Sequence, residues 1–492
     1  MTIERLEIQD ATLCAIGEQA DRLGVSAYVV GGYVRDRLLG KEGKDVDIVV
    51  LGDGGTIARQ IASALGWKEP VVFEKFGTAM CSVGDVRIEF VGARSESYAD
   101  SSRKPSVKPA TLDEDLLRRD FTVNAMAVSL NAARRGTLID TLGGREDLAA
   151  GLLRTPRDPQ VTFKDDPLRM MRTVRFAAQL GFVPVDDVLA AIGDMRERMS
   201  IVSMERVADE FLKMMASPRP STGLLLLYES GLADVVLPEL SQMAGVEQRK
   251  EYHHKDVLRH TLQVLDNVCG VSDKVWLRVA ALMHDIAKPR TKAFKEGIGW
   301  TFHGHEEIGA RMIKPIFRRL KLPFTHVPYV EKLVRLHLRP MALVDSEVTD
   351  SAVRRLMFDA GEEIDDLMVL CKADITSKNH KKVSRIRRNY DLVLEKMIEV
   401  EKKDKIRAWQ PPLRGEEIIE ICSIPASPLV GAMKDAITDA ILDGRIQNNH
   451  DEALRFLLSI KDGMIEGFKK TGKAPKIPKE KLFQGKTPPS SD

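Results

Sequence analysis

Hydrophobic residues follow two different spacings in the first 150 positions of the chain. Continuous or alternating apolar runs, which are typical of strands, occur at residues 27–30, 46–51, 71–76 and 79–91. Apolar residues three and four apart, as on one face of a helix, occur at residues 11–23, 34–39 and 57–65. Because the two patterns alternate along the chain, residues 1–150 are predicted to form an α/β head.

From about residue 112 the helical spacing continues almost to the end of the chain. The predicted fold class is therefore α+β, an α/β head followed by all-α domains. Prolines interrupt the helical pattern and give further domain boundaries. The predicted helical domains are residues 151–245, 246–405 and 406–466.

Two segments lack either apolar spacing. Residues 95–111 are polar, with serine, lysine and proline, and are predicted to form a mobile loop. Residues 467–492 are rich in lysine, proline, glycine and serine, with few apolar residues, and are predicted to be disordered.

Composition gives no global sign of nucleic-acid binding. Lysine and arginine number 74 against 72 aspartates and glutamates, a formal charge of +2, so any nucleic-acid surface must be a local patch. Aromatic residues make up only 5%, which argues against aromatic platforms as the main means of holding nucleic acid.

The five cysteines lie far apart and form no close pair, which argues against a zinc ribbon or a disulfide framework. This usage favours a reducing compartment. Apolar stretches such as Val279–Met283 are far too short to span a bilayer. A cytoplasmic protein without membrane contact is predicted.

A glycine turn joins the first strand to the next helix. Gly31 and Gly32 let the backbone approach a ligand closely, and their amides lie at a helix start, where phosphate binds well. Arg35 follows in the first helical turn, where the helix dipole disfavours a cation. An anionic ligand would explain its presence there.

Three acidic residues lie on neighbouring strands. Asp45 and Asp47 are two positions apart on a strand, so they should project to the same side. Two carboxylates so close repel each other unless cations lie between them, and oxygen ligands suit Mg²⁺. Glu89, in a later strand, could face them as a third catalytic acid. A solvated aspartate pair at a strand edge is the alternative.

The glycine turn with Arg35, followed by Asp45 and Asp47, resembles the signature of class II nucleotidyltransferases. That family comprises the bacterial and eukaryotic CCA-adding enzymes and the bacterial poly(A) polymerases. Three later segments are also similar to family motifs, at residues 118–126, 165–169 and 204–207. The first acid of the 165–169 motif is Asp165, where the family carries glutamate. Residues 87–94 lack the basic strand of the poly(A) polymerases, which favours CCA addition to tRNA.

The resemblance implies two-metal nucleotidyl transfer to the 3′ end of tRNA from CTP and ATP, with release of pyrophosphate and no nucleic-acid template. Arg119, Asp120 and Asn124 would hold triphosphate and ribose. Asp166 and Arg169, one helical turn apart, are expected to share a helix face and read the base edge. Arg172 and Arg175 would continue that face toward phosphate. Residues 151–245 would then be a nucleotide-selecting neck.

Histidines and aspartates beyond residue 250 resemble the ligands of HD metal-dependent phosphohydrolases. The predicted ligands are His260, His284, Asp285, His305, His337 and Asp374. Imidazole with carboxylate suits a transition metal such as Mn²⁺, Ni²⁺, Fe²⁺ or Zn²⁺. The site could be a phosphohydrolase that repairs RNA 3′ ends.

Residues 406–466 resemble the tail that grips tRNA in these enzymes. Two rival functions stay open: a poly(A) polymerase of the same family, and an HD phosphohydrolase whose head only binds RNA. The sequence also leaves open the oligomeric state and whether addition is complete or stops at CC or A.

Overall fold

A computed structural model of the 492-residue chain describes residues 5–43, 45–74, 77–97, 106–246, 256–297, 299–344, 349–376, 380–404 and 412–473. The chain forms two compact units. The first comprises Met1–His305 and Arg311–Val327, and the second comprises Glu306–Ala310 and Pro328–Asp492.

A seven-stranded sheet forms the head, with the strand order β3-β4-β5-β2-β1-β8-β9. Only β2 and β5 pair in parallel; the other neighbours are antiparallel. The strands are β1 (Ala27–Val30), β2 (Asp45–Val50), β3 (Val71–Phe73), β4 (Thr78–Val83), β5 (Val86–Gly92), β8 (Ala127–Ser129) and β9 (Leu138–Ile139). The sheet and the helices that follow it confirm the predicted α+β class.

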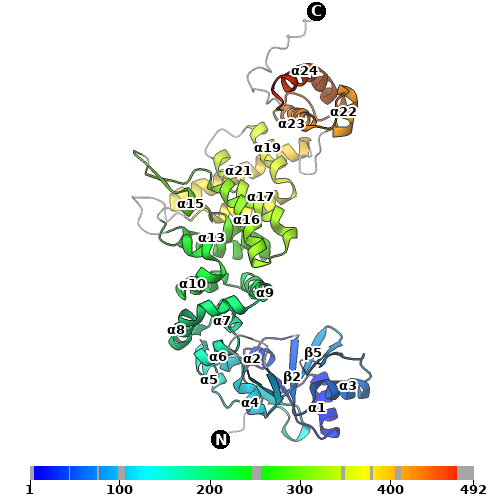
Figure 1. The fold of residues 1–492 in the computed structure, drawn as a ribbon, viewed down its shortest axis with the longest axis vertical. Helices are drawn as coiled ribbons and strands as arrows, with labels where there is room; N and C mark the ends of the chain where they lie inside the picture. Colours follow the sequence, from blue (N-terminus) through cyan, green and yellow to red (C-terminus); the bar gives the residue numbers. More distant parts are fainter. Residues whose placement is uncertain are drawn as a thin grey trace, which may run out of the picture. The chain divides into compact units, whose positions relative to one another are not determined.

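Different helices cover the two faces of this sheet. On one face α1 (Ala11–Arg22) and α3 (Gly54–Ala64) pack side by side (Figure 1), and Ile48 joins their core. The next residue of β2, Val49, points the other way and packs with Leu116 of α4 (Leu112–Leu117). Alternation along β2 therefore turns its odd-numbered residues toward α4.

The polar segment 95–111 is more ordered at its ends than predicted. Strands β6 (Arg94–Ser97) and β7 (Ser106–Pro109) form a separate two-stranded sheet, and the prediction of a mobile loop is wrong for these residues. Antiparallel pairing satisfies their backbone groups without a hydrophobic run. Residues 98–105 lie outside the described part of the chain.

The first unit contains further helices besides α1, α3 and α4. They are α2 within the head (Gly32–Leu38), then α5 (Gly144–Ala150), α6 (Pro159–Asp165), α7 (Leu168–Leu180), α8 (Asp186–Met195), α9 (Met204–Met215), α10 (Pro220–Glu229), α11 (Ala233–Val236), α12 (Pro238–Gln242), α13 (Val257–Cys269), α14 (Val275–Met283) and α15 (Lys288–Thr291). Two short hairpin strands, β12 (Ala293–Lys295) and β13 (Gly299–Thr301), precede α16 (His305–Leu320).

The second unit is helical throughout its described residues. Its helices are α17 (Val327–Leu336), α18 (Arg339–Val344), α19 (Asp350–Ala360), α20 (Ile364–Ala373), α21 (His380–Asp404), α22 (Gly415–Cys422), α23 (Pro428–Leu442) and α24 (His450–Thr471). None of the described helices is long and apolar enough to cross a membrane.

Helix α24 runs past the predicted start of disorder at residue 467. Phe468 packs against the core of the last three helices, and Gly472, with a φ of 65°, ends the helix. Continued apolar spacing thus holds the helix to Thr471, and the predicted disorder is wrong for these residues. Residues 474–492 lie outside the described part.

Candidate functional site

Asp45, Asp47 and Glu89 lie on the two central strands of the head. Asp45 and Asp47 share the side of β2 that Val49 turns toward α4. Glu89 lies directly opposite Asp47 in the parallel register of β2 and β5. The glycine turn is adjacent: a Cβ added at Gly31 would lie 3.3 Å from Asp47 Oδ2. The fold therefore brings the three predicted acids and the turn together.

The electrostatics of these acids fit a cation site. Burial raises the pKa of Asp47, and Asp45 adds to this against the opposing effect of Arg119. Burial and the charge of Asp47 also raise the pKa of Glu89. The acids therefore resist ionisation side by side, a cost that a divalent cation bound between them would remove.

Arg119 lies beside the same turn. Its Nη1 would be 3.1 Å from a Cβ at Gly31, a close approach, and the φ of 71° at Gly31 favours glycine there. Its Nη2 donates to Asp115 Oδ2 at 3.1 Å. A cation thus lies near both the glycine turn and Asp47. Its contact with a triphosphate stays a prediction.

Arg35 has protein partners for its guanidinium. The side chain is buried, its Nη1 donates to Asn124 Oδ1 at 2.6 Å, and its Nε donates to Asp36 Oδ1 at 2.9 Å. The neighbouring carboxylate of Asp36 is one anionic partner of Arg35, and the bond to Asn124 holds that side chain in place. Contact of Arg35 with an anionic ligand stays a prediction.

Asp120 is the centre of a buried hydrogen-bond network. Its Oδ1 accepts from Asn124 Nδ2 at 3.0 Å, and its Oδ2 accepts from Arg172 Nε and Nη2 at 2.8 and 2.6 Å. Burial opposes ionisation, but Arg172 and Asn124 outweigh it and lower the pKa of Asp120. Both oxygens have protein donors, so ribose binding by Asp120 would require these bonds to be shared or exchanged.

Asp166 and Arg169 do not lie on one helix, so the predicted shared helix face is wrong. Asp166 follows the last residue of α6 and has an extended backbone, whereas Arg169 belongs to α7. Pro167 lies between them, and a proline disfavours helical geometry in the residue before it. The Asp166 side chain accepts from Arg206 Nη2 at 3.3 Å, whereas Arg169 Nη2 donates to the carbonyl of Arg118 at 2.6 Å.

Glu210, which was not predicted, binds both later arginines of α7. Its carboxylate lies 2.7 Å from Arg175 Nε and 3.7 Å from Arg172 Nη1. Burial lowers the pKa of Arg175 to about 10, against the opposing charge of Glu210. The sequence held one signal: Glu210 falls on the apolar face of α9, beside Phe211 and Met214.

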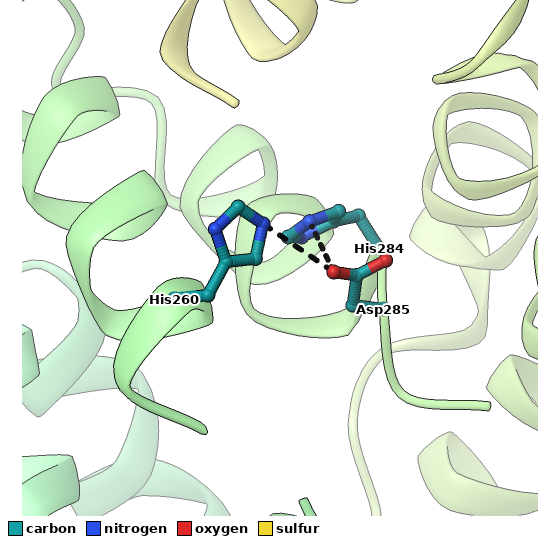
Figure 2. Close-up of side chains that lie close together, drawn as sticks. All are labelled: His260, His284 and Asp285. Carbon is teal, nitrogen blue, oxygen red and sulfur yellow. Dashed lines mark ion pairs between the residues drawn. The ribbon is translucent and has the colours of Figure 1, made fainter. Parts of the chain in front are cut away.

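A second cluster lies around Asp285 in the first unit, where His260, His284 and Asp285 point toward one another (Figure 2). Their ligand atoms lie within 4.8 Å of one another, and all three residues are buried. Asp285 Oδ2 is 3.4 Å from His260 Nε2 and 3.1 Å from His284 Nε2. The other carboxylate oxygen of Asp285, Oδ1, is 3.3 Å from His305 Nε2.

Backbone carbonyls orient two of these rings. Nδ1 of His284 donates to the carbonyl of Ala281 at 2.7 Å, and Nδ1 of His305 donates to that of Phe302 at 2.7 Å. In a neutral ring the lone pair is then on Nε2, which faces the carboxylate of Asp285. A nitrogen lone pair that points at a carboxylate is repelled by it unless a cation lies between them. This arrangement is usual for histidines that bind a metal.

Lys288, a residue that the sequence reasoning missed, also contacts Asp285. Its Nζ lies 2.6 Å from Asp285 Oδ2. Burial would raise the pKa of Asp285, but the charges of His284, when its ring is protonated, and of Lys288 outweigh burial and hold that pKa well below its usual range. The carboxylate is therefore ionised.

The remaining two predicted ligands belong to the second unit. His337 is buried at the end of α17, with Nδ1 2.6 Å from the carbonyl of Val334. Its own carbonyl accepts from Cys371 Sγ at 2.9 Å. Asp374 is half-buried just after α20. Their role as ligands stays a prediction.

Three family descriptions match successive parts of the chain. Residues 27–154 match "Poly A polymerase head domain", residues 181–243 match "Probable RNA and SrmB- binding site of polymerase A", and residues 257–379 match "HD domain". Domains of the first and last kinds generally use divalent metals. The fold and the acid site thus define a template-independent nucleotidyltransferase head joined to an HD domain.

Curated relatives extend over most of the chain. An A-adding tRNA nucleotidyltransferase of Deinococcus radiodurans is 32% identical, over 85% of this chain and 92% of its own length. A CC-adding tRNA nucleotidyltransferase of Thermus thermophilus is 31% identical, over 89% and 94%. A tRNA nucleotidyltransferase solved with a primer tRNA and an incoming ATP analog is 25% identical, with a TM-score of 0.57 over 79% of this chain and 99% of that one. This chain belongs to the class II tRNA nucleotidyltransferase family.

Proposed function

We propose that this chain adds CCA to the 3′ end of tRNA from CTP and ATP. The observation that supports this best is the acid trio of Asp45, Asp47 and Glu89 on two paired strands, next to the Gly31 turn. The raised pKa values of Asp47 and Glu89 favour a bound cation there, and oxygen ligands suit Mg²⁺.

The chain's own residues would position both reactants. The free amides of the Gly31 turn and the guanidinium of Arg119 would hold the triphosphate. The acids would hold two Mg²⁺ ions, which when bound help to activate the RNA 3′-OH and neutralise charge on the leaving pyrophosphate. No protein nucleophile is required.

Base selection would fall to Asp166 and Arg169 despite the break between their helices. A carboxylate and a guanidinium offer an acceptor and donors, which fit the amino group and ring nitrogen shared by cytosine and adenine. Arg206 and the carbonyl of Arg118 orient the two side chains. Residues 151–245 would thus be the nucleotide-selecting neck, and residues 406–466 a tRNA-binding tail.

Incorporation assays test both the activity and its extent, because the relatives include A-adding and CC-adding enzymes. The substrates are a tRNA that lacks CCA and one that ends in CC, each with CTP, ATP or both. Complete addition gives three nucleotides on the first substrate and one on the second. Growth by two nucleotides, growth only on the second substrate, or a ladder of adenosines would each contradict the proposal.

Two substitutions assign the roles. Asp45→Ala should abolish transfer, whereas Asp166→Ala should retain transfer and lose the choice of C and A over U and G. The matched control is Asp158→Ala, which removes an exposed acid that caps the start of α6. Retained selectivity in Asp166→Ala would exclude that residue from base selection.

We also propose that the cluster around Asp285 binds a transition metal, such as Mn²⁺, Ni²⁺, Fe²⁺ or Zn²⁺, and hydrolyses phosphate esters at RNA 3′ ends. The orientation of His284 and His305 toward Asp285 supports metal binding. Metal analysis of the purified protein tests it. Asp285→Asn should lose the metal and retain CCA addition; retained metal would contradict the site.

A cytoplasmic location is also proposed. All five cysteines are free, as expected in a reducing compartment.

A further inference from the structure

An aromatic pair lies on the short hairpin between Asp285 and His305. Phe294 of β12 and Trp300 of β13 are directly opposite in register, and their rings meet edge to face with centroids 5.2 Å apart. Phe294 is 53% exposed, and all of β12 is exposed. Trp300 is half-buried, so the pair keeps one exposed ring and one partly exposed ring on strands of three residues. Such a pair adds little to a core, and a ligand that stacks on it would better account for it.

One cation lies against a ring of this pair, and further cations lie near it in the sequence. Nζ of Lys292 lies 4.2 Å from the centre of the Trp300 ring. Between residues 288 and 301 the sequence has four cations, Lys288, Arg290, Lys292 and Lys295, and one acid, Glu296. In a chain whose charges nearly balance, this local excess indicates an anionic ligand.

The hairpin is followed along the chain by His305, a member of the Asp285 cluster. Lys288 Nζ lies 5.7 Å from the centre of the Phe302 ring and 2.6 Å from Asp285 Oδ2. The carbonyl of Phe302 orients His305. Trp300 is five residues before His305, a chain length of at most about 18 Å. A ligand on the rings would therefore lie close to the cluster.

We propose that this aromatic and basic hairpin binds the single-stranded 3′ end of an RNA and presents it to the Asp285 cluster. The proposal deepens the phosphohydrolase function proposed above and rests on it for the chemistry, though not for the binding. Bases stack on exposed aromatic rings whatever their sequence, and lysines beside the rings contact the phosphates. A protein partner fits less well, because lysine is depleted at protein interfaces.

The test uses the full chain and an eight-nucleotide single-stranded RNA that carries a 3′-phosphate and a photoreactive 4-thiouridine at its 3′ end. Crosslinks mapped by mass spectrometry should fall within residues 288–305. Phe294→Leu and Trp300→Leu keep apolar bulk but lose the ring, and each should reduce this crosslink and weaken the affinity of this site about 5- to 100-fold. Trp300→Tyr should restore both.

The matched control is Phe324→Leu, since Phe324 is a comparably exposed aromatic outside the hairpin. It should leave the crosslink unchanged. Crosslinks that map elsewhere, or leucine variants that crosslink like the unsubstituted protein, would overturn the proposal and leave the hairpin to a protein partner.

Hydrolysis distinguishes this proposal from the one on which it rests. With a small phosphodiester that has no base, such as bis(p-nitrophenyl) phosphate, the leucine variants should match the unsubstituted protein. With the RNA their KM should rise while kcat changes little. If no substrate is hydrolysed but the crosslinks persist, the proposed phosphohydrolase function is wrong and the proposed binding of RNA to the hairpin is supported.

Discussion

Arg172 of α7 holds Asp120 of the head with two guanidinium nitrogens, at 2.8 and 2.6 Å. The pair is the direct electrostatic link between the helix that carries Arg169 and the segment that carries Asn124. A carboxylate held in this way fixes the position of α7 against the head, and with it the distance between the groups proposed to read the base and those proposed to bind phosphate.

Asp120→Asn should destabilise the protein by about 1–3 kcal/mol, because it leaves Arg172 without its main charged partner. The lowered pKa of Asp120 means that its ionised form stabilises the fold above its unfolded pKa of about 4, and that this contribution is lost as pH falls toward the folded value. Thermal midpoints at neutral pH should therefore differ, and the difference should shrink below about pH 4. Asp113→Asn, an exposed neighbour, is the control; a pH-independent difference would contradict the ion-pair explanation.

Magnesium binding to the head should weaken as pH falls, beginning above the range of an ordinary carboxyl group. Protons compete with the cation for Asp47 and Glu89, whose pKa values are both raised. Calorimetric titration of Mg²⁺ with the nucleotide present, at about pH 5 and pH 7.5, measures this. Asp47→Asn should abolish binding, whereas the exposed Asp85→Asn should titrate like the unsubstituted protein. Equal affinity at both pH values would argue against these ligands.

Glu210→Gln should reduce kcat/KM for CTP and ATP together by roughly tenfold, the size expected when a charged partner of a buried arginine is lost. In the described chain Glu210 contacts two arginines of α7 and a lysine, and neither Asp166 nor Arg169 is among its ion-pair partners. The preference for C and A over U and G should therefore persist. Competition assays with all four nucleotides separate the two effects, and Glu210→Asp should recover part of the rate. Altered preference would assign Glu210 to base selection.

Arg278 is a buried cation that binds only carbonyls among its described partners. It donates to the carbonyls of Met215 and Ser217 at the end of α9 and to that of Ser272 before α14. Arg278→Met should lower the free energy of unfolding by about 1–3 kcal/mol or more, since buried carbonyls lose their donor. Thermal unfolding tests this, with the exposed Arg259→Met as control. An unchanged midpoint would show that water replaces the guanidinium.

The sequence predicted most of the head because its signals are local. Period-two spacing is enough to put Asp45 and Asp47 on one side of a strand. The position of Glu89 opposite Asp47 depends on the parallel pairing of two strands about forty residues apart, which periodicity does not specify. The prediction for Glu89 rested on its alternation with apolar residues, which indicates a side of the strand but not the neighbouring strand.

Predictions about side-chain partners were less successful, for a physical reason. Arg35 was assigned to a ligand because the helix dipole disfavours it, yet the adjacent Asp36 and the distant Asn124 stabilise it. Contacts over long sequence distances, such as those of Glu210 with α7, are set by tertiary packing. The helix break at Pro167, in contrast, was predictable, because proline restricts the residue before it.

The break at Pro167 also has a mechanical consequence. A single unbroken helix would place the carboxylate of Asp166 and the guanidinium of Arg169 on one helix face. Here Asp166 is extended, and its carboxylate and carbonyl accept from the backbone amides of Leu168 and Arg169, which ties the residue to the first turn of α7. Any movement of α7 relative to α6 would therefore carry the two groups together and leave their spacing unchanged.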